Sequence, residues 1–189
     1  MKEKLLLIGA GGFGRIAMEH AMKQYECAFV DDGIDIGTEV CGIKVIGHIE
    51  DLPKLFDGFK KLVVTIGNNS FREHVYTEAK HIGFTFPNII CDSEYISPYA
   101  KIGNGCVILN NVCIQNGTTV GNGVLLSPGV ELHHDTIIED CVLIYANSVI
   151  RAMVHVGKRV KIGSTCTISN QKHIEADQVI ADGVTVNEI

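Results

Sequence analysis

The sequence predicts two domains of different fold class, an α/β domain in residues 1–90 and a parallel β-helix in residues 91–189. Two patterns lead to this prediction. In residues 1–90, short aliphatic runs alternate with segments of helical apolar spacing, which is typical of parallel strands joined by crossover helices. From Ile96 to Val186, every sixth residue is Ile, Leu or Val, and a fixed period of six indicates a solenoid of stacked short strands.

The first domain is expected to contain a small parallel sheet. The predicted strands are KLLLIG (4–9), CAFVDD (27–32), KLVVTIG (61–67) and FTFPNII (84–90), and the predicted helices are GRIAMEHAMKQY (14–25) and SFREHVYTEAKHIG (70–83). With 46% hydrophobic residues and 189 residues in all, the chain can fold two small soluble domains.

The fifth place of each hexad in the second domain is nearly as regular as the first. It holds Ala, Cys, Val, Thr or Ser from Ala100 to Cys166, and only Lys172 and Gln178 interrupt the pattern before Val184. We expect the aliphatic side chain to fill the interior and the small one to fit where the chain turns a corner. Glycines in the N-G and P-G pairs supply the turn conformation.

Composition excludes several classes of protein. The formal net charge of −6, with no basic cluster, argues against a protein that mainly binds nucleic-acid phosphates. The seven cysteines form no C-x-x-C or zinc-type pair, so we expect free thiols in a reducing compartment and no metal site. Only four aliphatic residues precede the first glycines, so we expect no signal peptide, no membrane partner and a cytoplasmic location.

Three predicted strand ends carry residues suited to a nucleotide-linked ligand. LIGAGGFGR follows a strand and opens a helix, so its backbone N–H groups could face a phosphate. Two aspartates end the next strand, where carboxylates can bind a ribose or a base, although a solvated strand end looks the same. These loops should share one edge of the sheet. The candidates are Gly11, Gly12, Phe13, Asp31, Asp32, Gly67, Asn68 and Asn69; helix capping by Asn69 or Ser70 is the alternative in the third loop.

The order of the motifs G-x-G-G-x-G, D-D and I-G-N-N-x-x-R before a hexad solenoid resembles the hexapeptide-repeat acyltransferases. Within them, essentially the whole chain is similar to the group of sialic-acid O-acetyltransferases and nucleotide-amino-sugar N-acetyltransferases. The resemblance implies a Rossmann-like domain that binds a nucleotide-linked sugar, a left-handed β-helix of about five coils, acetyl-CoA as donor, and a homotrimer. A histidine that is frequent in the family's first loop is Phe13 here.

The family's catalytic stretch N-T-G-A-V-V-E-H-D-C-x-I-G is similar to SPGVELHHDTIIE, which assigns the catalytic histidine to His134 and its acid to Asp135. His134 occupies the third place of its hexad, so we expect it at the outer surface. Imidazole can accept the proton lost when an amine attacks a thioester, and a carboxylate can orient the ring. A solvated surface histidine is the alternative. His133 replaces the family's glutamate, and Ser127 its asparagine.

Three departures from the family concern the acetyl donor. Leu143 replaces a second histidine, IRAMVHVG replaces a glycine-rich face, and the C-terminal G-x-P-A-K segment is absent. The retained His–Asp pair favours an acetyl-CoA-dependent enzyme, whereas the altered donor face favours a non-catalytic relative. We expect an N-acetyltransferase acting on the amine of a nucleotide-linked 4-amino-deoxy sugar, a glycan or surface-polysaccharide precursor. The alternatives are O-acetylation of a sialic-acid-like sugar and a non-catalytic sugar-nucleotide-binding relative. His155 lies out of step with an 18-residue coil relative to His134, which disfavours a zinc site of converging histidines.

Overall fold

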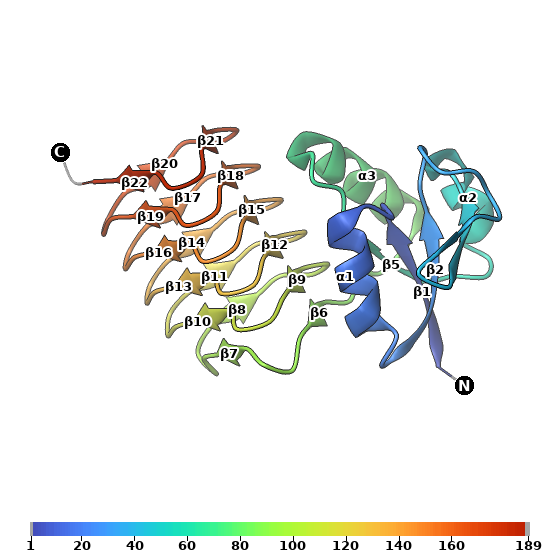
Figure 1. Ribbon diagram of the computed structural model, residues 1–189, viewed down its shortest axis with the longest axis horizontal. Coiled ribbons are helices and arrows are strands. Elements are labelled where there is room, and N and C mark those ends of the chain that lie inside the picture. The colour runs from blue at the N-terminus through green and yellow to red at the C-terminus, as the bar shows by residue number, and fades with distance from the viewer. Residues whose placement is uncertain (1, 188–189) are drawn as a thin grey trace. The chain divides into compact units, whose positions relative to one another are not determined.

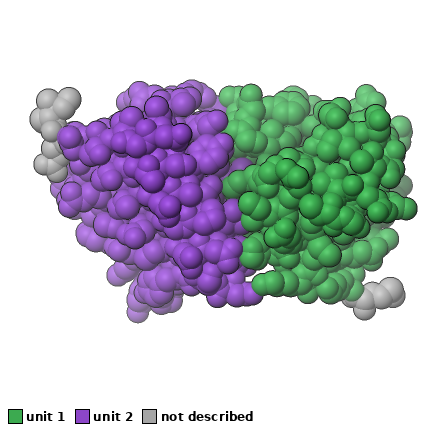
Figure 2. Space-filling model, in the orientation of Figure 1, with its two compact units in different colours: residues 1–89 green, residues 90–189 purple. Residues whose placement is uncertain are grey.

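The computed structural model describes residues 2–187, and the chain divides into two compact units, Met1–Ile89 and Ile90–Ile189 (Figures 1 and 2). The first unit is an α/β domain, and the second is a solenoid of short parallel strands. The fold class predicted from the sequence is therefore confirmed. No helix within residues 2–187 is both long and apolar enough to span a membrane.

The first unit is built on a five-stranded sheet with the order β3-β4-β2-β1-β5. Its elements are β1 (Glu3–Ile8), α1 (Gly12–Ala21), β2 (Tyr25–Val30), β3 (Glu39–Val40), β4 (Ile43–Gly47), the 3-10 helix η1 (Ile49–Asp51), α2 (Leu52–Leu55), β5 (Lys61–Val64) and α3 (Asn69–Ile82). All pairings are parallel except β3 with β4. Because β2 and β5 flank β1 on opposite sides, the winding of the chain reverses there, which is where open α/β sheets bind ligands.

Both faces of this sheet are covered, which explains its near-continuous aliphatic strands. Leu6 and Ile8 of β1 belong to a core that includes Val75 and Ala79 of α3. Leu5 and Leu7 alternate with them and are equally buried, and the apolar face of α1 is buried as well.

Three features of the first unit differ from the sequence prediction. Helix α1 ends at Ala21, because the chain turns before β2 begins at Tyr25. Strands β3 and β4 and helix α2 were not predicted. The segment FTFPNII is not one strand: Thr85 forms an isolated bridge to Lys61, and after Pro87 the strand β6 joins the solenoid.

As far as residue 187, where the described part of the chain ends, the solenoid has three sides and seventeen two-residue strands, numbered β6 to β22. Sheet I contains β6 (Ile89–Ile90), β9 (Val107–Ile108), β12 (Leu125–Leu126), β15 (Leu143–Ile144), β18 (Lys161–Ile162) and β21 (Val179–Ile180). Sheet II contains β7 (Tyr95–Ile96), β10 (Cys113–Ile114), β13 (Glu131–Leu132), β16 (Val149–Ile150), β19 (Thr167–Ile168) and β22 (Thr185–Val186). Sheet III contains β8 (Lys101–Ile102), β11 (Thr119–Val120), β14 (Ile137–Ile138), β17 (His155–Val156) and β20 (His173–Ile174).

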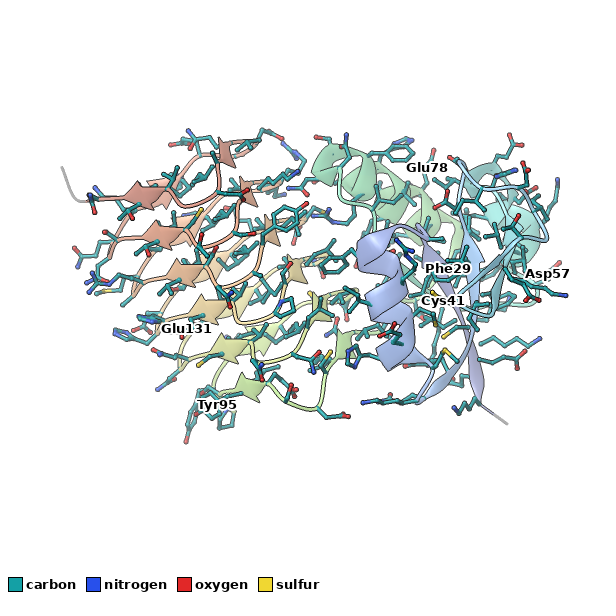
Figure 3. The ribbon with its side chains drawn as sticks, viewed as in Figure 1. Phe29, Cys41, Asp57, Glu78, Tyr95 and Glu131 are labelled. Carbon is teal, nitrogen blue, oxygen red and sulfur yellow. The ribbon has the colours of Figure 1, made fainter. Side chains whose placement is uncertain are left out.

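The register of the strands confirms the six-residue period. Cys113 pairs with Glu131, so one coil contains 18 residues. The second residue of each strand points inward, and these are the aliphatic first places of the hexads. Fifth-place residues such as Val124 and Val142 complete the same core. Figure 3 shows Tyr95 and Glu131, the first residues of their strands, on the outer surface.

Most corners of the solenoid contain a residue in the left-handed region, with φ between 56° and 72°. Glycine supplies it in Asn116–Gly117 and Pro128–Gly129, as the pairs predict. Nine corners use another residue: Asn111, Asp135, Cys141, Asn147, Met153, Arg159, Thr165, Gln171 and Asp177. The N–H of each of these residues donates to a carbonyl oxygen of the preceding coil, which helps to hold a conformation that such residues rarely adopt alone.

Candidate active site

The first predicted loop leaves backbone N–H groups exposed at the start of α1. Gly11 is the N-cap of α1 and no side chain caps this helix end. A Cβ atom added to Gly11 or Gly12 would have no neighbour within 4 Å, so the approach to the helix end is open. At Gly14, in contrast, a Cβ would overlap the carbonyl oxygen of Gly9, so this glycine is required for packing. The helix dipole and free N–H groups suit a phosphate.

Asp31 holds the first and second loops together. The N–H of Ala10 donates to Oδ2 of Asp31 at 2.7 Å, and the N–H of Gly33 donates to Oδ1 at 2.8 Å. Asp32 accepts from the N–H of Ile49 at 2.8 Å. Both carboxylates therefore organise the edge of the sheet, and each keeps lone pairs for a ligand. The sequence pattern does not indicate that Ala10 is the partner of Asp31.

The third loop is fixed to the first by hydrogen bonds. The hydroxyl of Thr65 lies 2.8 Å from the carbonyl oxygen of Gly9, to which it donates. Asn68 is the N-cap of α3 and accepts from the N–H of Phe71 at 3.0 Å, so the cap is neither Asn69 nor Ser70. The fully buried Arg72 donates from Nη1 to the carbonyl oxygen of Ile66 at 2.7 Å.

These hydrogen bonds bring the three loops to the carboxyl edge of one sheet, as expected from the parallel order of the strands. Gly67 lies in this edge beside the cap of α3, and a Cβ there would also meet nothing within 4 Å. Phe13 lies in the first turn of α1 and is partly exposed. His48 was not identified from the sequence; its Nδ1 lies 2.9 Å from the backbone oxygen of Asp31.

In the solenoid, His134 and Asp135 form the corner between β13 of sheet II and β14 of sheet III. Nδ1 of His134 lies 2.8 Å from Oδ2 of Asp135, and the side chains are 52% and 61% exposed. An ionised carboxylate only accepts hydrogen bonds, so the neutral ring carries its proton on Nδ1 and keeps a lone pair on Nε2. The pair is thus arranged for a ring nitrogen to accept a proton at the surface.

His134 and Asp135 can pair although they are adjacent, because the backbone turns sharply at this corner of the solenoid. Asp135 has a φ of +58°, which folds its carboxylate back toward the preceding ring. The N–H of His134 donates to Oε1 of Gln115 at 3.1 Å, and the N–H of Asp135 donates to the carbonyl oxygen of Asn116 at 3.0 Å. The preceding coil therefore holds both backbones. Gln115 was not among the predicted residues, although the 18-residue period places it beside His133.

Other histidines have different partners. Nε2 of His133 lies 3.4 Å from Oε2 of Glu131, and His133 directly follows strand β13 of sheet II. His155 of sheet III lies 2.7 Å from Oε1 of Glu139, and its ring contacts that of His173 edge to face. Among the described residues, no group of three or more His, Cys, Asp or Glu side chains could hold a metal ion.

Two positions that depart from the family pattern are buried, and a third position in a departing stretch is exposed. Leu143 in β15 is buried, and Ser127 is 6% exposed. Met153 stands one coil after Asp135 on the same corner and is 46% exposed.

The solenoid also contains a cavity of about 420 Å³ lined by residues of its later coils. The lining includes Tyr145, Lys161, Ser164 and Asp182, and Nζ of Lys161 lies 5.4 Å from the centre of the Tyr145 ring. These residues lie on sheet I and at the corner between sheets I and II. His134 lies at the corner between sheets II and III, so within one solenoid the cavity and the His–Asp pair occupy different edges.

Comparisons with known proteins give consistent matches for both units. Residues 4–79 match the PglD N-terminal domain family, and residues 99–134 and 117–152 match the bacterial transferase hexapeptide (six repeats) family. No curated protein matches the chain significantly.

Several solved structures cover nearly the whole chain. A mutant of perosamine N-acetyltransferase from Caulobacter crescentus, in complex with CoA and GDP-perosamine, is 26% identical with a TM-score of 0.92, covering 98% of this chain and 89% of that chain. The acetyltransferase domain of PglB from Neisseria gonorrhoeae is 27% identical with a TM-score of 0.91, covering 98% and 92%. In complex with acetyl coenzyme A, that domain is 28% identical with a TM-score of 0.86, covering 98% and 96%.

Proposed function

We propose that this chain acetylates the amine of a nucleotide-linked 4-amino-deoxy sugar, as a member of the hexapeptide-repeat, left-handed β-helix sugar acetyltransferases that carry a PglD-type N-terminal domain. Acetyl-CoA is the donor. The observation that carries this proposal is the surface pair of His134 and Asp135, with its 2.8 Å hydrogen bond to Nδ1. The product is a glycan or surface-polysaccharide precursor.

In the proposed reaction, the neutral amine attacks the thioester carbonyl and a C–N bond forms. Nε2 of His134 accepts the amine proton, and Asp135 stabilises the imidazolium through Nδ1. The tetrahedral intermediate then expels CoA by breaking the C–S bond, and the imidazolium returns the proton to the CoA sulfur. No covalent enzyme intermediate is required, so the cysteines need no catalytic role. General-base assistance of this kind contributes about 10²–10⁴ in rate.

The acceptor is proposed to bind at the carboxyl edge of the first unit. A nucleoside diphosphate carries its negative charge on the diphosphate, which suits the uncapped N-terminus of α1 at Gly11 and Gly12. Asp31 and Asp32 retain lone pairs for the ribose or base after their backbone bonds are made. The remaining contacts are proposed for the backbone and side chains of the predicted residues Phe13, Gly67, Asn68 and Asn69.

We also propose that the active assembly is a homotrimer in the cytoplasm. The position of the cavity around Lys161 supports a requirement for a second copy, because it lies on a different edge of the solenoid from His134. A neighbouring solenoid could bring one copy's cavity to the other copy's His–Asp pair, with the Lys161 ammonium available to a phosphate of the donor.

Two departures favour a non-catalytic relative: Leu143 is buried where the family has a second histidine, and IRAMVHVG, which includes the exposed Met153, stands where the family has a glycine-rich face. The deciding experiment is CoA release from acetyl-CoA with UDP-, dTDP- and GDP-linked 4-amino sugars, each matched to the same nucleotide sugar with a 4-hydroxyl. The proposal expects release with one amine and none with its hydroxyl partner. Release with hydroxyl acceptors alone indicates O-acetylation. Thermal stabilisation by a nucleotide sugar without any release indicates a binding protein.

A further inference from the structure

We propose that Gly117 is a positioning residue that keeps the carboxylate of Asp135 in contact with His134, an inference that rests on the proposed role of this pair. Gly117 lies 18 residues before Asp135, at the same corner of the preceding coil. A Cβ atom built on Gly117 would collide with Oδ1 of Asp135. The absence of a side chain at Gly117 therefore provides the space that the carboxylate occupies.

Moving the carboxylate is the least costly way to relieve this collision, because Oδ1 lies at the far end of the Asp135 side chain. The backbone of Asp135 is held by its N–H bond to the carbonyl oxygen of Asn116 at 3.0 Å and by the left-handed φ of +58°. Rotation of the side chain would remove Oδ1 from the new methyl group. It would also remove Oδ2 from Nδ1 of His134, because both oxygens belong to one planar group.

His134 would remain in place while it lost its partner. Its N–H is bound to Oε1 of Gln115 at 3.1 Å, and its carbonyl oxygen accepts from the N–H of Met153 at 3.1 Å. A methyl group at Gly117 should therefore leave the imidazole at the surface with its tautomer no longer fixed. In water the Nε2–H tautomer of a neutral imidazole then becomes populated, and it has no lone pair on Nε2 to accept the substrate proton.

The chain contains a matched control at another corner. Gly129 has the same φ of +72° as Gly117, and a Cβ built there would collide with Oδ1 of Asn147. Asn147 also occupies a left-handed corner, and its N–H donates to the carbonyl oxygen of Pro128 at 3.1 Å. Gly117→Ala and Gly129→Ala therefore introduce the same backbone strain and the same kind of collision. Only the first affects the carboxylate beside His134.

The experiment compares Gly117→Ala, Gly129→Ala, Asp135→Ala and the double variant Gly117→Ala/Asp135→Ala in the full chain. CoA release measures kcat and KM, and ¹⁵N–¹H correlation spectra of the His134 ring measure its tautomer without any substrate. We expect Gly117→Ala to lower kcat by about 10-fold or more, as loss of an oriented general base does, and to shift the ring from Nδ1–H toward Nε2–H. Gly129→Ala should change neither quantity. The double variant should be no slower than Asp135→Ala, because the collision disappears with the carboxylate.

Each result separates the inference from the function on which it rests. If Asp135→Ala keeps wild-type kcat, the proposed role of the pair is wrong, whereas the ring spectra still report whether Gly117 positions the carboxylate. An Nδ1–H ring in a folded Gly117→Ala protein overturns the inference. An equal loss of kcat in Gly117→Ala and Gly129→Ala also overturns the inference. The same holds if the double variant is slower than Asp135→Ala by the factor that Gly117→Ala alone produces.

Discussion

Replacement of Asp31 by Ala tests whether this carboxylate acts on the ligand directly or through the loops that it joins. In the structure, Asp31 accepts the part-buried N–H of Ala10 and the exposed N–H of Gly33. A hydrogen bond to a charged group contributes about 1.5–3 kcal/mol, and exposure reduces the second bond to a fraction of this. We therefore expect Asp31→Ala to lower the free energy of unfolding of the first unit by about 2 kcal/mol.

Asp32→Ala is the control, because it removes a single exposed bond to the N–H of Ile49. Its expected cost is about 0.5–1 kcal/mol. Urea denaturation followed by circular dichroism gives the difference in stability between the two variants. Amide hydrogen exchange shows where in the structure the stability is lost. The N–H of Ala10 should lose protection in Asp31→Ala and keep its protection in Asp32→Ala.

Binding of a nucleotide sugar completes the comparison. If Asp31 organises the loops, its loss should weaken binding in proportion to the loss of protection at Ala10. An Asp31→Ala protein with wild-type stability and wild-type exchange, but without affinity for the nucleotide sugar, would refute this reasoning. It would assign Asp31 to the ligand alone.

Three further predictions concern packing, thiol reactivity and pH. Gly14→Ala should lower the Tm of the first unit markedly, since overpacking costs about 1–3 kcal/mol and the methyl group would overlap a loop carbonyl; an unchanged Tm contradicts the close helix–strand approach. Burial raises the pKa of the Cys106 thiol to about 12, so native protein at pH 8 should alkylate at the exposed Cys41 well before Cys106, as peptide mass spectrometry can measure. Hydrogen bonds from Arg159 lower the pKa of Asp177, so its stabilisation is complete above the ordinary aspartate pKa of about 3.9 and is lost as the pH falls below it. Urea midpoints of Asp177→Asn and wild type should therefore differ at neutral pH and converge in acid.

The solenoid was largely predictable because an aliphatic residue recurs at every sixth position of the sequence. Each coil repeats after 18 residues, so a single inward aliphatic place specifies the register of every strand. The same period predicted that His134 would be exposed. The corner residues were less predictable, because neighbouring coils impose a left-handed conformation on side chains such as Met153 and Thr165 that rarely adopt it.

The first unit was predictable where its elements are long and less so where they are short. Strands β1, β2 and β5 contain continuous buried apolar runs, and helices α1 and α3 have a helical apolar spacing. Strand β3 has two residues and α2 has four, too few for any period to appear. The tight turn between β3 and β4 begins with Cys41 at a φ of +51°, which is an unusual residue for such a turn.

The sequence indicates which residues belong to the candidate site, but it indicates only some of the contacts between them. His134 and Asp135 are adjacent in the sequence, so their pairing required only the correct corner. The contacts of Gln115 and Gly117 cross between coils and depend on how one corner lies over the next. The structural role of Asp31 depends on the position of a backbone N–H that no side-chain pattern reports.

In the proposed reaction, the imidazole of His134 accepts the proton of the attacking amine. The most direct test is the rate of CoA release by His134→Gln, measured with saturating acetyl-CoA and a nucleotide-linked 4-amino sugar that the wild-type protein acetylates. Glutamine preserves much of the shape and polarity but cannot take up the proton. The proposed role of His134 predicts that kcat falls by a factor of about 10²–10⁴, while the Kd for the nucleotide sugar stays unchanged. A kcat within a few-fold of wild type would contradict it.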